Sequence, residues 1–75
     1  MVNLTSLVVN ECAQIIKIEC DIKIKKRLLE LGFIKGANIK ILAISSLKKT
    51  YLLNIQNCVL AIRESSLKGV YVCKK

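Results

Sequence analysis

The side chains most able to carry chemistry in this chain are its four cysteines, Cys12, Cys20, Cys58 and Cys73. Their spacing contains no Cys-x-x-Cys pair, and the sequence has no histidine. A structural zinc site usually draws on closely spaced ligand pairs, so this pattern does not indicate one. Disulfides need an oxidising compartment, and the chain shows no secretory signal pattern. We therefore expect free, partly buried thiols, with no metal and no cofactor.

The acidic residues do not form an obvious catalytic pair. General acid–base chemistry needs a histidine or two carboxylates with different pKa values, and nucleotide binding needs a glycine-rich phosphate loop. Ferrous iron favours imidazole and carboxylate ligands in a compact cluster. The chain lacks the phosphate loop and scatters its five acids: Glu11, Glu19, Asp21, Glu30 and Glu64. The sequence predicts no enzymatic activity and no iron site of its own.

Basic residues strongly outnumber acidic ones. Thirteen Lys and Arg against five Asp and Glu give a formal net charge of +8. Such a surplus suits a nucleic acid, an anionic membrane surface or an acidic protein partner. A general bias toward Ile, Lys and Asn would also produce it. No apolar run approaches the roughly 18 residues that span a bilayer, so we expect no membrane insertion. We expect residues 1–75 to form a single cytoplasmic domain.

Strand and turn signals alternate along most of the sequence. Short runs rich in β-branched residues predict five strands. Gln56-Asn57 suits a tight hairpin turn, and residues 64–69 suit one 3₁₀ turn ending at a glycine. Short strands at this spacing favour a small closed barrel, because closure removes exposed edges. The expected strands are 13–19, 38–45, 50–55, 58–62 and 70–73. The fold class is therefore mainly β: a five-stranded barrel with one short α-helix after the first strand.

That helix is expected from Ile22 to about Leu31, with Asp21 as its N-cap. At 100° per residue, three apolar side chains share a stripe about 60° wide. We predict that this inner stripe lies on the barrel; it consists of Ile24, Leu28 and Leu31.

The opposite side of the helix carries a second set of apolar residues. Ile22 and Leu29 lie about 180° from the inner stripe, with Lys25 and Lys26 alongside. In one interpretation Ile22 packs beneath the N-terminal segment around residues 4–7, and Leu29 is an ordinary exposed leucine. In the other, these four residues form an outer strip that binds a partner protein or a second copy of the chain.

Two glycines in the segment after the helix predict a helix cap and a turn. Gly32 follows the last helical leucine, at a position where a helix commonly ends with a residue in the left-handed conformation. Gly36 suits the positive-φ position of a type II turn that leads into the next strand. Asn10, after Val9, tolerates left-handed geometry and predicts a further turn.

This segment resembles the FeoA family, small cytoplasmic accessory proteins of bacterial ferrous iron uptake. The family pattern is Leu-x-x-Leu-Gly, an apolar residue, and a Pro-Gly turn before a strand. Lys35 stands where proline is usual, and Val9-Asn10 replaces a second Pro-Gly turn. The residues that fill the pattern are Leu28, Leu31, Gly32, Phe33 and Gly36. Similar segments extend from Leu4 to about Val72: residues 4–7, 13–18, 60–63 and 70–72.

The resemblance implies an SH3-like barrel that associates with FeoB, a ferrous iron transporter with a cytoplasmic G-protein region. The chain would then act at the inner face of the membrane by protein–protein interaction, and homo-oligomers remain an alternative. Another alternative is a basic SH3-like module that binds nucleic acid, or a stand-alone FeoA-like domain related to iron-dependent repressors. Phe33 and Tyr51 fit the core, which leaves Tyr71 as the one aromatic placed to stack on bases. We therefore expect no nucleic-acid partner.

Overall fold

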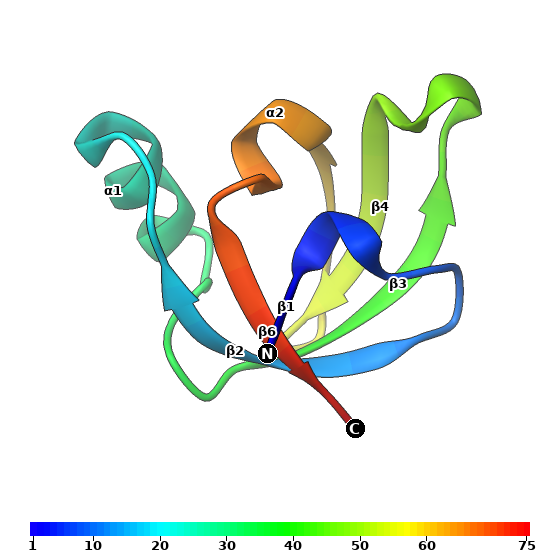
Figure 1. The fold of residues 1–75 in the computed structure, drawn as a ribbon, viewed down its shortest axis with the longest axis horizontal. Coiled ribbons are helices and arrows are strands. Elements are labelled where there is room, and N and C mark those ends of the chain that lie inside the picture. The colour runs from blue at the N-terminus through cyan, green and yellow to red at the C-terminus, as the bar shows by residue number, and fades with distance from the viewer.

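The computed structural model describes all residues, Met1–Lys75, and contains one antiparallel sheet of six strands (Figure 1). The strands pair in the order β1-β6-β2-β3-β4-β5. Two α-helices and two 3₁₀ turns, η1 and η2, connect them. Neither α-helix has the length and the continuous apolar surface that a membrane-spanning helix needs. The bounds are β1 Val2–Asn3, η1 Leu4–Ser6, β2 Cys12–Ile18, α1 Ile22–Glu30, β3 Asn38–Ile44, η2 Ser46–Lys48, β4 Thr50–Ile55, β5 Cys58–Arg63, α2 Glu64–Leu67 and β6 Val70–Lys74.

The predicted strands are confirmed, but the expected count of five and the closed barrel are wrong. The expected single α-helix is also wrong, because Glu64–Leu67 form a second α-helix, α2, where we expected a 3₁₀ turn. The additional strand is β1, which pairs with β6 through Val2 and Asn3. Two residues are too few to show an alternating pattern, so the sequence does not reveal it. The order of pairing also begins with β1 and ends with β5, and these two edge strands do not pair with each other. The sheet therefore curls around the core without closing.

The turns follow the predicted backbone chemistry. Gln56 and Asn57 both have positive φ, 48° and 67°, as a type I′ hairpin between β4 and β5 requires. Gly36 has φ 90°, and the Ala37 N–H donates to the Ile34 carbonyl over 3.0 Å, which closes the expected turn. Asn10 is also left-handed, with φ 74°.

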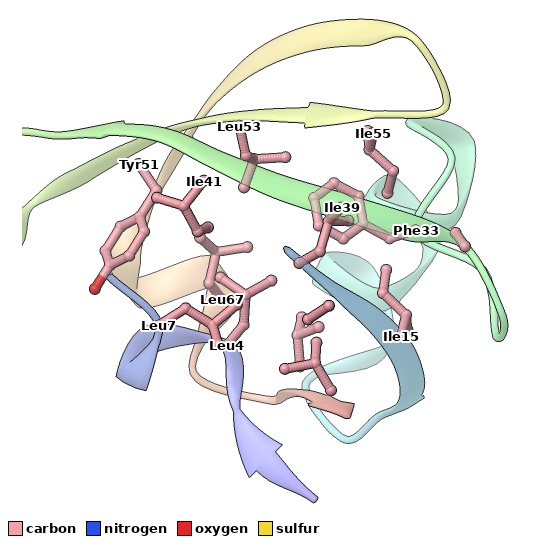
Figure 2. Close-up of a cluster of buried hydrophobic side chains, with 14 of the residues drawn as sticks. Leu4, Leu7, Ile15, Phe33, Ile39, Ile41, Tyr51, Leu53, Ile55 and Leu67 are labelled. Atoms are coloured by element: carbon pink, nitrogen blue, oxygen red, sulfur yellow. The ribbon is translucent and has the colours of Figure 1, made fainter. Parts of the chain in front are cut away.

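Figure 2 shows the core between the curled sheet and the segments that cover it. Tyr51, Leu53 and Ile55 alternate along β4 and are all buried, which places Tyr51 in the core as predicted. Leucines from the N-terminal segment and α2 pack against the same cluster. The Tyr51 hydroxyl donates to the Thr5 carbonyl over 2.9 Å, so the one polar atom of this ring is satisfied.

A bulge decides which side chains of β2 face the core. Ala13 and Ile15 are its fully buried residues, and Ile18, but not Ile16, is packed against the core cluster. The pairing of β2 with β6 shifts register between Ile15 and Lys17. A bulge at this point changes which side chains face inward, and the alternation cannot be extrapolated across it.

The four cysteines are free thiols. Only Cys20 is partly buried; Cys12, Cys58 and Cys73 are exposed. The expectation of partly buried thiols is therefore wrong for three of the four. Cys12 and Cys73 neighbour the buried Ala13 and Val72 along their strands, so alternation directs them outward.

Candidate functional surface on helix α1

Helix α1 begins as its sequence indicates. Asp21 is the N-cap, and its Oδ1 accepts a hydrogen bond from the Lys23 N–H over 2.8 Å. A capping carboxylate satisfies one of the unpaired N–H groups of the first turn and suits the positive end of the helix dipole. The first helical residue is therefore Ile22, as predicted.

The C-terminal end of α1 is a Schellman motif. The Gly32 N–H donates to the Leu29 carbonyl over 3.1 Å, and the Phe33 N–H donates to the Leu28 carbonyl over 3.0 Å. Gly32 has φ 104°, the left-handed conformation that this motif requires. Phe33 and Leu28 are both buried, which supplies the apolar contact that accompanies the motif. The cap fixes where the helix stops and how it lies against the sheet.

The inner stripe lies on the core, as predicted. Leu28 is 2% exposed, and Ile24 and Leu31 are partly buried against the core cluster. This contact fixes the rotation of the helix about its axis. The opposite side of α1 must therefore face solvent.

All four residues of the outer strip are exposed. Ile22 is 79% exposed and Leu29 is 44% exposed, and Lys25 and Lys26 are exposed beside them. Ile22 does not pack beneath the N-terminal segment, because residues 4–7 turn their leucines into the core instead. The structure thus brings the predicted residues together on one face of one helix.

The charges of the outer strip are not neutralised within the molecule. The two ion pairs of the chain join Lys17 to Glu19 and Lys74 to Glu11, and neither involves α1. Lys25 and Lys26 therefore surround the exposed apolar pair as free cations. An acidic partner surface would find complementary charge here.

Tyr71, the one stacking candidate, has a lysine ammonium over one face of its ring. The Lys17 ammonium lies 5.4 Å from the centroid of the Tyr71 ring. The side chain of Lys17 also bonds to Glu19, and this bond raises the pKa of Lys17. A base that stacked on this face of the ring would have to displace the Lys17 ammonium.

No group of three or more Cys, Asp or Glu side chains lies close enough to hold a metal ion. The acidic residues engage in local contacts instead. Glu11 accepts a hydrogen bond from the Val8 N–H over 2.8 Å, which lowers the pKa of Glu11. This contact holds the turn before β2.

Comparison with known families gives one clear match. The model of the FeoA domain matches residues 2–74, nearly the whole chain. This match confirms the resemblance seen in the sequence motifs. No curated protein matches the sequence at a significant level.

Solved structures give the same result. FeoA from Chlorobium tepidum has a TM-score of 0.90 at 23% identity, over 97% of this chain and 70% of that chain. FeoA from Stenotrophomonas maltophilia, described as a prokaryotic SH3-domain protein complexed with zinc, has a TM-score of 0.83 at 26% identity, over 97% and 91%. IdeR from T. acidophilum has a TM-score of 0.86 at 25% identity, over 99% of this chain but 34% of that chain. The fold is therefore SH3-like.

Proposed function

We propose that this chain, which belongs to the FeoA family and so takes part in ferrous iron transport, acts by binding the cytoplasmic G-protein region of a FeoB-like transporter. In this proposal residues 1–75 form one functional domain, located in the cytoplasm at the inner face of the membrane. The domain needs no catalytic group of its own, because its role is to associate with the transporter.

The observation that carries the proposal is the exposed outer strip of α1. Ile22 and Leu29 offer an apolar centre, and Lys25 and Lys26 flank it. An interface commonly draws its affinity from a few apolar anchors, while charges at the rim speed the encounter of the two proteins. A strip of this composition fits an apolar patch ringed by acidic residues.

The test is a binding measurement with a purified cytoplasmic region. This region comes from the transporter whose gene lies nearest to the gene of this chain. Leu29→Gln should weaken binding by about tenfold or more, since truncating a central interface anchor commonly costs over 1 kcal/mol. The matched control is Leu47→Gln, which removes another exposed leucine, 84% exposed, in η2. We expect the control to bind as the parent does.

Two results would reject the proposal. Equal binding by the parent and the Leu29→Gln protein would mean that the strip is not the interface. Loss of the folded spectrum in the Leu29→Gln protein would mean that the leucine is structural. Ile22→Gln gives an independent check, because 79% of that side chain is already exposed.

The strip could instead join two copies of this chain. The net charge of +8 opposes that association, because two cationic strips would face each other. Sedimentation of the parent protein across a range of salt concentrations separates the two cases. We expect a monomer at physiological salt.

A further inference from the structure

A second surface lies on the other side of α1. A groove of about 620 Å³ separates the inner stripe of α1 from strand β5 and the start of α2. The part of its wall formed by β5 includes Leu60 and Ile62, both partly buried against the core. This volume falls in the range of ligand-binding clefts, and six of the ten residues that line the groove are hydrophobic.

The wall formed by β5 is an unpaired sheet edge. β5 ends the order of strands and pairs only with β4. Gln56 and Asn57 have the positive φ of a type I′ turn, and Ile55 and Cys58 are partners in the register of β4 and β5. Such a turn makes these partners a hydrogen-bonded pair, and bonded and non-bonded pairs then alternate along the hairpin. The backbone groups of Val59 and Ala61 therefore point away from β4, and Ala61 lines the groove. An open edge of this kind is a template for another strand.

The chain's two arginines both line this groove. Arg27 comes from α1 and Arg63 from the end of β5, so the fold brings together residues that are distant in sequence. Both side chains are exposed, neither forms an ion pair, and no acidic residue lines the groove. Arginine binds carboxylates through two parallel hydrogen bonds.

From these observations we propose that the groove binds an extended, acidic segment of a partner protein, which adds to the sheet as a strand beside β5. Backbone bonds to Val59 and Ala61 hold the segment, alternate apolar side chains fill the groove, and carboxylates pair with Arg27 and Arg63. A second copy of this chain is disfavoured by its charge of +8. This site is separate from the outer strip and does not depend on the proposed transporter interface.

The probe is a phage-displayed library of random ten-residue peptides, selected on the immobilised full chain. We expect enriched sequences that alternate apolar and acidic residues. Failure to enrich any sequence, or enrichment of peptides without acidic residues, would overturn the proposal.

Two variants then test the charge contacts with a synthetic peptide of the enriched sequence. The double variant Arg27→Glu/Arg63→Glu should bind it at least about tenfold more weakly, since charge pairs at an interface are removed. The double variant Lys40→Glu/Lys75→Glu makes the same change in net charge at two exposed lysines that do not line the groove, and it should bind as the parent does. If both double variants bound the peptide equally weakly, the loss would be a general effect of net charge, and the groove would be rejected as the binding site.

Backbone pairing is tested separately. Proline is tolerated on an edge strand where its missing N–H faces solvent, so Ala61→Pro should keep the fold and lose the peptide. In the parent, the peptide should slow hydrogen exchange at the amides of Val59 and Ala61. A peptide that bound the groove as a helix would leave hydrogen exchange at both amides unchanged, and this result would overturn strand addition. The exchange measurement uses the parent protein, so it decides the question even if Ala61→Pro fails to fold.

Discussion

Leu28 and Leu29 are adjacent in the sequence but have opposite environments. Leu28 is 2% exposed and packs with Phe33, whereas Leu29 is 44% exposed on the outer strip. A helix rotates 100° per residue, so one step moves a side chain from the core face to its edge or beyond. Substitutions at these two leucines therefore test two roles of one helix separately: Leu28 its contribution to stability, and Leu29 its proposed contribution to binding.

Leu28→Ala should lower the free energy of unfolding by ~2–5 kcal/mol, because it leaves a cavity in the core. Leu29→Ala should change it by no more than about 0.5 kcal/mol, as exposed substitutions usually do. Urea unfolding of both variants, followed by circular dichroism, measures the difference. Similar losses in the two variants would contradict the assignment of the inner stripe and the outer strip.

Tyr51 contributes through its hydroxyl as well as its ring. Tyr51→Phe removes the bond to the Thr5 carbonyl and should cost about 0.5–1.5 kcal/mol of stability at neutral pH. Chemical denaturation of the two proteins side by side measures this loss. Equal stability would mean that water replaces the hydroxyl without cost.

The same residue should give a pH dependence. Burial is the main cause that raises the pKa of Tyr51 above its ordinary value of 10.0. As pH rises, the unfolded chain loses this proton first, so its contribution to stability is complete below about pH 10 and is lost as pH rises through the folded pKa. The parent should therefore lose stability faster than Tyr51→Phe above about pH 10. Parallel curves for the two proteins would contradict the shift.

At the scale of elements, α1 depends on both of its caps. It has only nine residues, and a helix of this length is marginal without tertiary contacts and capping. Asp21→Ala should lower stability by about 1 kcal/mol, because the Lys23 N–H loses its acceptor. Asp21→Asn keeps an acceptor and should lose less. Thermal unfolding ranks the three proteins, and an order with Asn below Ala would contradict the capping role.

The sequence predicted the elements well where local chemistry decides them. The hairpin turn at Gln56-Asn57, the N-cap at Asp21 and the left-handed Gly32 each depend on neighbouring residues alone, and the structure has all three. The outer strip is also a local feature, because the 100° rotation per residue of one helix is enough to place its four residues on one face. What lay within a single element could be predicted.

What the sequence missed depends on contacts between distant elements. The bulge between Ile15 and Lys17 follows from how β2 fits β6, and no residue pattern marks it. The pairing of β1 with β6 joins the two ends of the chain. The groove likewise requires Arg27 and Arg63 from separate elements to meet. Tertiary pairing sets all three, so a local pattern cannot reveal them.

At the scale of the whole molecule, the charge surplus is broad and the apolar surface is local. The charge of +8 attracts any acidic partner from a distance, whereas an apolar centre such as Ile22 and Leu29 decides where that partner docks. The two contributions should therefore respond differently to salt. Long-range attraction weakens with ionic strength, while apolar contact does not.

Charge reversal at two places tests this division with the same change in net charge. Lys25→Glu/Lys26→Glu alters the outer strip, and Lys48→Glu/Lys49→Glu alters the connection between β3 and β4, on the far side of the molecule from α1 (Figure 1). If the outer strip docks the transporter, the first variant should slow association with its cytoplasmic region by about tenfold or more, and the second much less. Stopped-flow association at low and physiological salt measures both rates. Equal slowing by the two variants would mean that the partner responds to total charge and that the strip has no particular role.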